Sequence, residues 1–140
     1  MRRSATRAAL LSSLLLAMIS ACNSEGRVSV VPVEGKVTYD GKPLTKGTIT
    51  FRPEKGPMAV GEIQPDGSYK LKTYQDGDGA VVGTHKVGVI AGDDSPTSMP
   101  GSPGYVAPKA LIPEKFNNPD TSGLTATVSE AKKDVNFDLK

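Results

Sequence analysis

Cysteine and histidine, the residue types that most often carry chemistry, each occur once in this chain of 140 residues, as Cys22 and His85. A zinc site takes three or four ligands from His, Cys and carboxylates, so these two residues do not supply a typical one. His85 opens a segment of alternating character and shares the parity of Val87 and Val89. We therefore expect a capping or partly buried histidine rather than a catalytic base or a ligand.

Asp76 and Asp78 lie in a Gly/Asp segment, Asp76-Gly77-Asp78-Gly79, whose spacing matches the beginning of a calcium loop. A full EF-hand loop needs a glutamate at its twelfth position, and that position is Val87. The two aspartates remain weak candidates for a looser calcium site, and a solvated turn is the alternative. The chain also lacks a G-x-S-x-G motif. The sequence predicts no enzyme, no metal centre and no cofactor.

Aromatic residues suggest at most a weak surface for recognition. Tyr39, Tyr74 and Tyr105 would suit a sugar-stacking platform, but the chain has no tryptophan, and packing in turns or the core is the alternative. Tyr105, Leu111 and Phe116 lie in a proline-rich segment and form a candidate partner-binding loop.

Cys22 has the best-defined chemistry. Arg2, Arg3 and Arg7 precede a largely apolar run over residues 8–19, which is typical of a signal peptide and too short for a membrane span. Ile19-Ser20-Ala21-Cys22 then resembles the lipobox of bacterial lipoproteins, in which the thiol is linked to a diacylglyceryl group before cleavage. The alternative is an ordinary secretory signal that leaves Cys22 as a free thiol.

This interpretation divides the chain into a signal peptide (1–21), a lipidated N-terminus with a short tether (22–32) and one domain (33–140). Removal of the signal takes away three of the 17 basic residues and leaves 14 against 15 acidic residues. The mature chain is therefore nearly neutral, and its charge does not favour nucleic-acid binding. With Cys22 lipidated, no disulfide is possible. Asn23 after the cysteine favours the outer membrane over the inner membrane.

The domain is predicted to be all-β. Period-two alternation, with turn residues between most segments, favours a seven-stranded antiparallel β-sandwich. The predicted strands cover residues 33–39, 48–52, 59–63, 68–73, 84–91, 124–128 and 135–139.

A long proline-rich loop separates the fifth and sixth predicted strands. Residues 92–121 contain six prolines, which cannot donate to a strand ladder. We expect residues 92–104 to be mobile and residues 110–118 to be packed on the sandwich.

Several segments together resemble carboxypeptidase regulatory-like (transthyretin-like) domains and, in their second half, small bacterial lipoproteins that carry this domain. The resemblance covers essentially residues 33–140 and implies a prealbumin-like or Ig-like sandwich, usually without catalytic activity. It rests on residues 35–44 (GKVTYDGKPL), 47–51 (GTITF), 66–71 (DGSYKL), 79–89, 112–125 and 134–139.

These observations favour a lipid-anchored, non-catalytic module of a bacterial cell envelope. Its predicted partners are the membrane, through lipid on Cys22, and an envelope protein or glycan. The alternative is a periplasmic carrier for a small molecule or calcium, with the Gly/Asp loop or the proline-rich loop as its site.

Overall fold

The computed structural model describes residues 27–92, 101–103, 105 and 109–140, and it is all-β apart from one short 3₁₀ helix. Cys22 lies outside the described residues. The described chain contains no helix long and apolar enough to cross a membrane.

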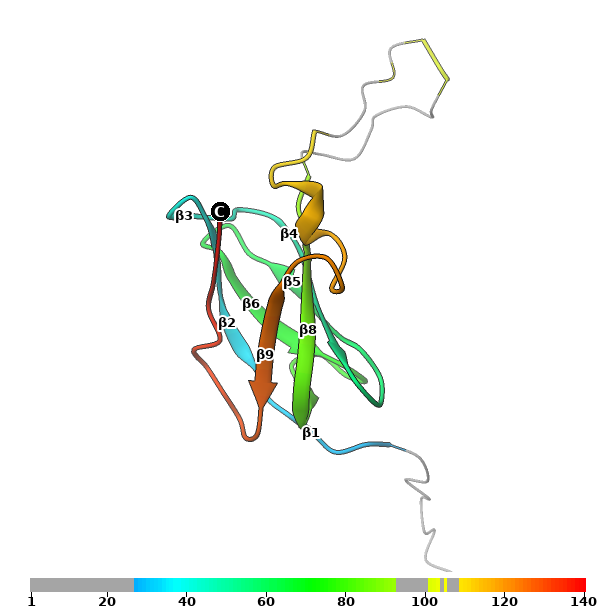
Figure 1. The fold of residues 1–140 in the computed structure, drawn as a ribbon, viewed down its shortest axis with the longest axis vertical. Coiled ribbons are helices and arrows are strands. Elements are labelled where there is room, and N and C mark those ends of the chain that lie inside the picture. The colour runs from blue at the N-terminus through cyan, green and yellow to red at the C-terminus, as the bar shows by residue number, and fades with distance from the viewer. Residues whose placement is uncertain (1–26, 93–100, 104, 106–108) are drawn as a thin grey trace, which may run out of the picture.

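A curled sheet forms the body of the molecule, with strand order β10-β2-β6-β5-β4-β8-β9. In Figure 1, β8 and β9 lie in front of β2, β6 and β5, as expected where a sheet curls over one core. This arrangement is consistent with a β-sandwich. The seven strands are β2 (Glu34–Tyr39), β4 (Gly47–Pro53), β5 (Ala59–Ile63), β6 (Ser68–Lys72), β8 (Gly83–Ile90), β9 (Leu124–Val128) and β10 (Phe137–Leu139).

All seven predicted strands are present, since alternating apolar residues bury one face of each strand. In β4 and β6, for example, Ile49, Phe51, Tyr69 and Leu71 are buried. The prediction of a wholly antiparallel sheet is wrong at β10, which pairs in parallel with β2. After β9 the chain turns back along the edge of β2, so β10 runs in the direction of β2.

Three short strands were not predicted. β1 (Val30–Val31) pairs with β7 (Ala80–Val81), so the end of the predicted tether and the residues directly after the Gly/Asp segment form a second small sheet. β3 (Lys42–Pro43) pairs with β2 across Asp40 and Gly41, both of which have positive φ. Two such residues are typical of a two-residue hairpin turn.

The second half of the proline-rich segment packs against the core, as predicted. Ile112 and Phe116 are both buried, and Phe116 ends the 3₁₀ helix η1 (Glu114–Phe116). The prediction of a mobile first half falls largely on residues 93–100, which lie outside the described residues.

An aliphatic and aromatic core fills the curled sheet. The Phe51 ring from β4 contacts the rings of Tyr69 at 6.2 Å, His85 at 5.7 Å and Phe137 at 5.9 Å between centroids. These four rings come from β4, β6, β8 and β10, so the core joins distant parts of the sheet.

Candidate functional site

His85 faces inward, as its parity indicates, but it is fully buried rather than capping or partly buried. Its Nε2 lies 2.7 Å from the Val81 carbonyl oxygen, and its ring packs on Phe51. Its Nδ1 has no hydrogen-bond partner in the described part of the chain. The ring ties β8 to the short strand β7 and has no route to a solvent-borne substrate.

The predicted calcium residues serve the turn itself. One oxygen of Asp78 accepts the Thr73 amide at 2.7 Å, and the other accepts the Tyr74 and Gln75 amides, each at 2.9 Å. Asp76 instead pairs with Lys72 at 3.1 Å on the surface. Across the described ranges, no three His, Cys, Asp or Glu side chains gather closely enough to hold a metal ion. The geometry therefore gives Asp78 a turn-closing role.

Asp78→Asn should destabilise the protein by about 1 kcal/mol, because an amide supplies only one of the two accepting oxygens. Partial burial raises the pKa of the Asp78 carboxyl, but hydrogen bonds from the Thr73, Tyr74 and Gln75 amides outweigh it and lower the pKa below its ordinary value of 3.8. A depressed pKa in the folded state stabilises the fold above the unfolded-state pKa, and this contribution is lost as pH falls through the folded-state value.

Urea unfolding across pH should therefore show the full difference in unfolding free energy between wild type and Asp78→Asn near neutrality. This difference should shrink below about pH 4. Asp76→Asn is the matched control. Its exposed carboxylate forms a surface ion pair with Lys72, so little change is expected. A difference for Asp78→Asn that stays constant into acid would contradict this role.

The candidate partner-binding loop is only partly available at the surface. Phe116 is 4% exposed and Leu111 packs against the core, whereas Tyr105 is partly exposed. The role proposed for Phe116 is therefore corrected to a core contact, because a side chain this deeply buried offers no area to a partner.

The three tyrosines do not form a common platform. Tyr39 packs against the core from β2, and the hydroxyl of Tyr74 accepts the Val28 amide at 3.1 Å near β1. Tyr105 lies in the segment between β8 and η1.

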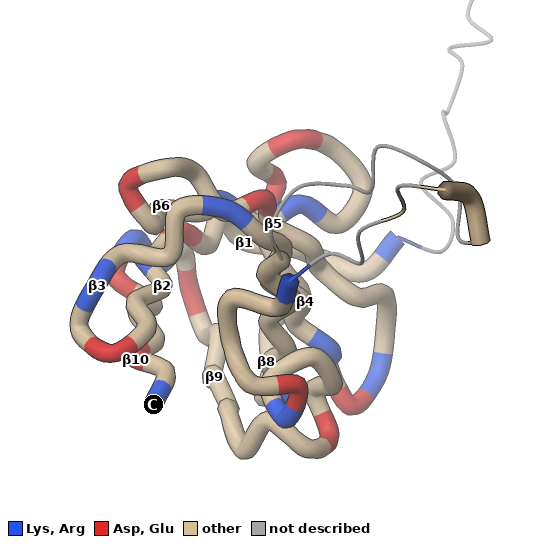
Figure 2. Tube along the Cα trace, turned by 90° about the horizontal axis from the view of Figure 1, so that it is seen from above, with Lys and Arg blue, Asp and Glu red and all other residues tan. Residues whose placement is uncertain are grey.

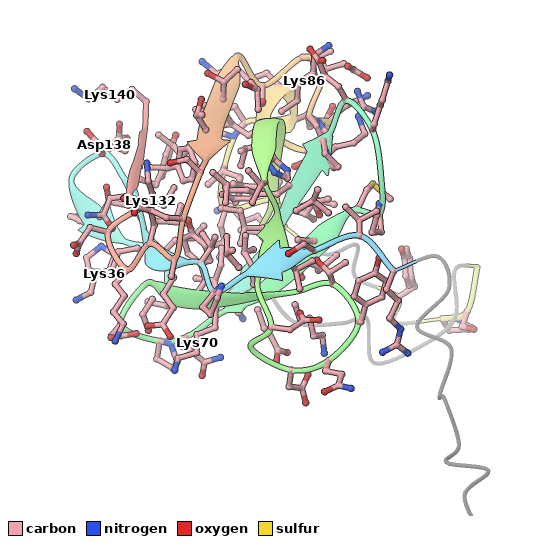
Figure 3. The ribbon with its side chains drawn as sticks, turned by 90° about the horizontal axis from the view of Figure 1, so that it is seen from below. Lys36, Lys70, Lys86, Lys132, Asp138 and Lys140 are labelled. Carbon is pink, nitrogen blue, oxygen red and sulfur yellow. The ribbon has the colours of Figure 1, made fainter. Side chains whose placement is uncertain are left out.

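A concavity of about 940 Å³ lies on the outer face of β2, β6 and β5. Most of its lining residues are polar or charged, and they carry both signs of charge, as expected for the wet face of alternating strands. Glu34 and Lys70 are cross-strand neighbours with an ion pair of 3.1 Å. Figure 3 shows Lys36 and Lys70 projecting outward from this side of the molecule. Sequence alternation indicated which side chains face out, but not the strand register that brings these charges together.

Ser68 lines the concavity, and its hydroxyl is engaged in the neighbouring turn. The hydroxyl of Ser68, on its rim, donates to Asp66 at 2.5 Å and so serves the β5–β6 turn. This hydrogen bond, together with that from the Ser68 amide, lowers the pKa of Asp66. The chain's sole histidine is in the core, so no imidazole base accompanies Ser68.

Asp120 forms a charged cluster that the sequence did not reveal. Its carboxylate pairs with Arg52 of β4 and, at 3.0 Å, with Lys86 of β8. Hydrogen bonds from Arg52 and then Lys86 lower the pKa of Asp120. Arg52 and Lys86 are register partners, so the cluster fastens the segment after η1 to two neighbouring strands. All three groups are substantially solvent-exposed, and the cluster is best understood as a surface clamp.

The fold and these surfaces define a small all-β protein with a polar exterior. Comparison with protein-family models, curated proteins and solved structures found no significant match for this chain.

Proposed function

We propose that this chain is a lipid-anchored, non-catalytic module of a bacterial cell envelope that binds or scaffolds at the membrane surface. The observation that carries the proposal is the N-terminal pattern: three arginines, a short apolar run, two small residues and the only cysteine. Cleavage before Cys22 would leave its diacylglyceryl group as the anchor, with the outer membrane as its location. Each buried acyl CH₂ contributes about 0.8 kcal/mol, so two or more chains hold firmly.

The domain on this anchor is proposed to be a carboxypeptidase regulatory-like, prealbumin-like sandwich. The residues of the resemblance supply the turns and strands of the curled sheet, including the Asp40–Gly41 hairpin and the β5–β6 turn. Their order along the chain, rather than any single motif, supports the assignment. An envelope protein or glycan is the proposed partner, and the polar outer faces of the sheet suit either one.

Cys22→Ser should abolish lipid attachment. In bacteria fed labelled palmitate, the wild-type chain is expected to take up label and to be recovered with membranes. Its N-terminal peptide should begin at Cys22 and carry a lipid-sized mass increment. The serine variant should take up no label, because a hydroxyl cannot replace the thiol in thioether formation.

Ser20→Ala is the matched control, since it changes the same segment but keeps a small residue before the cysteine. It should be labelled like the wild type. An unmodified Cys22 in the wild-type chain, or cleavage at another bond, would overturn the anchor.

A further inference from the structure

Three segments meet at the end of the sandwich where the described chain begins. We call residues 27–31, 54–58 and 73–82 the N-terminal pole. β1 pairs with β7, and the Val28 amide donates to the Tyr74 hydroxyl at 3.1 Å. A Cβ on Gly56 would lie 3.6 Å from Val81 and 3.9 Å from Val28. The first residues of the described chain are therefore held against the body of the protein.

This pole collects exposed apolar side chains. Val28, Met58, Tyr74 and Val82 are 37–53% exposed. Among the described residues only Ile90 is a further exposed large apolar side chain, and it ends β8 away from the pole. Figure 1 shows β1 at one end of the molecule and the segment that contains η1 at the other. Most of the exposed large apolar side chains therefore gather at one end of the molecule.

Tyr74 is suited to a membrane interface. The guanidinium of Arg27 lies 5.2 Å from the centroid of its ring. Tyrosine and arginine side chains both have an apolar part and a polar end, and tyrosine is enriched where bilayer meets water. An exposed apolar surface bordered by such amphipathic side chains is typical of a contact site.

The chain from Cys22 to Arg27 is too short to keep the pole far from a membrane. Five residue steps span at most about 18 Å when fully extended. Because Arg27 and Val28 are held at Tyr74, the anchor cannot gain length by releasing β1 without breaking those contacts. A lipid on Cys22 therefore places this pole, rather than the opposite one, nearest the headgroups.

Charge does not provide the attraction. Figure 2 shows basic and acidic residues interspersed along the chain trace, and the pole itself carries Arg27 and Lys55 beside Glu54, Asp76 and Asp78. Contact with the bilayer must therefore come from the anchor and the apolar side chains, with little dependence on anionic lipid.

We propose that the N-terminal pole rests in the headgroup region of the bilayer and holds the sandwich upright, with the end that carries η1 directed away from the membrane. This inference rests on the proposed lipid anchor at Cys22. It makes Val28, Tyr74 and Val82 an interfacial surface. It also brings the end of the concavity that Asp76 and Gly77 line next to the membrane.

The absence of tryptophan from the chain allows a direct test. Val82→Trp and Ile90→Trp form a matched pair, because both residues are aliphatic and about half exposed, and they flank the two ends of β8. Eight residue steps along the strand separate the two positions by about 27 Å. Each full-length lipidated variant is reconstituted into phosphatidylethanolamine and phosphatidylglycerol vesicles that contain a headgroup-labelled quenching lipid.

The tryptophan at position 82 should lose most of its fluorescence, and the one at position 90 very little. Tyr74→Trp provides a second probe of the pole if Val82→Trp folds poorly. Equal quenching at both ends of β8, in protein that floats with the vesicles, would overturn the orientation while leaving the anchor intact. Wild-type protein that fails to float would instead overturn the anchor.

Discussion

Gly35→Ala is expected to destabilise this protein by about 3 kcal/mol or more, although the substitution adds only one methyl group to a strand. Gly35 faces inward from β2 opposite Tyr69. A Cβ there would lie 1.9 Å from the carbonyl oxygen of Val135 and 2.9 Å from the Tyr69 hydroxyl. Both contacts are closer than non-bonded atoms tolerate, so the segment before β10 would have to move.

That movement would also break a partly buried hydrogen bond. The Tyr69 hydroxyl donates to the Val135 carbonyl at 2.5 Å, and burial raises the pKa of this tyrosine well above its ordinary value. The same segment is bound to β2 through the Val135 amide, which donates to the Glu34 carbonyl at 3.1 Å. The methyl group would therefore destabilise the fold in two ways, by disturbing the packing and by leaving polar groups without their hydrogen bonds.

Urea unfolding measures the effect, with Gly92→Ala as the control. Among the described residues, a Cβ at Gly92 would meet only the Lys109 carbonyl oxygen, at the ordinary contact distance of 3.7 Å, so a change within about 0.5 kcal/mol is expected. Combining Gly35→Ala with Tyr69→Phe should be non-additive, because both substitutions act on the Val135 carbonyl. Wild-type stability in Gly35→Ala would show that the segment before β10 is free to shift.

The part of the fold that could be predicted from the sequence is the part set by local alternation. Each strand of five or more residues buries one face, and its apolar positions recur every second residue. The sequence therefore predicted both the presence of each strand and which of its side chains face the core. His85 illustrates this argument, because its parity placed it on the inward face with Val87 and Val89. It is more deeply buried than the capping or partly buried position that was expected.

What could not be predicted depends on partners distant in the chain. β1 and β7 have two residues each, too short for a periodic pattern, and they are strands only because they pair with one another. The parallel direction of β10 follows from the path of the chain after β9, which alternation does not encode. The Asp120 cluster likewise depends on the register that places Arg52 beside Lys86.

The candidate site shows a related limit. Phe116 was predicted both to pack on the sandwich and to face a partner, and sequence reasoning had no means to choose between burial and exposure. Its position at the end of η1, against the core, decides for burial. The clustering of exposed apolar side chains at the N-terminal pole could not be predicted either, since these side chains become neighbours only when β1 pairs with β7.

Phe51→Ala is expected to cost about 3–5 kcal/mol, the usual range for truncating a buried phenylalanine. Phe51 is fully buried in β4 and contacts three rings that belong to β6, β8 and β10. With no tryptophan and only three phenylalanines in the chain, few other side chains are large enough to refill the space. The predicted loss is a large share of the unfolding free energy of a typical domain, which is about 5–15 kcal/mol.

Ile90→Ala is the control for this truncation, because Ile90 lies on the adjacent strand β8 but is 54% exposed. It should change the stability by no more than about 0.5 kcal/mol. Chemical denaturation should show a lower midpoint for Phe51→Ala with an unchanged slope, since the surface exposed on unfolding stays nearly the same. A loss for Phe51→Ala as small as that for Ile90→Ala would mean that the four-ring contact does not hold the sheet closed. The core would then have to be stabilised mainly by its aliphatic residues, Ile49, Leu71, Val87 and Leu139 among them.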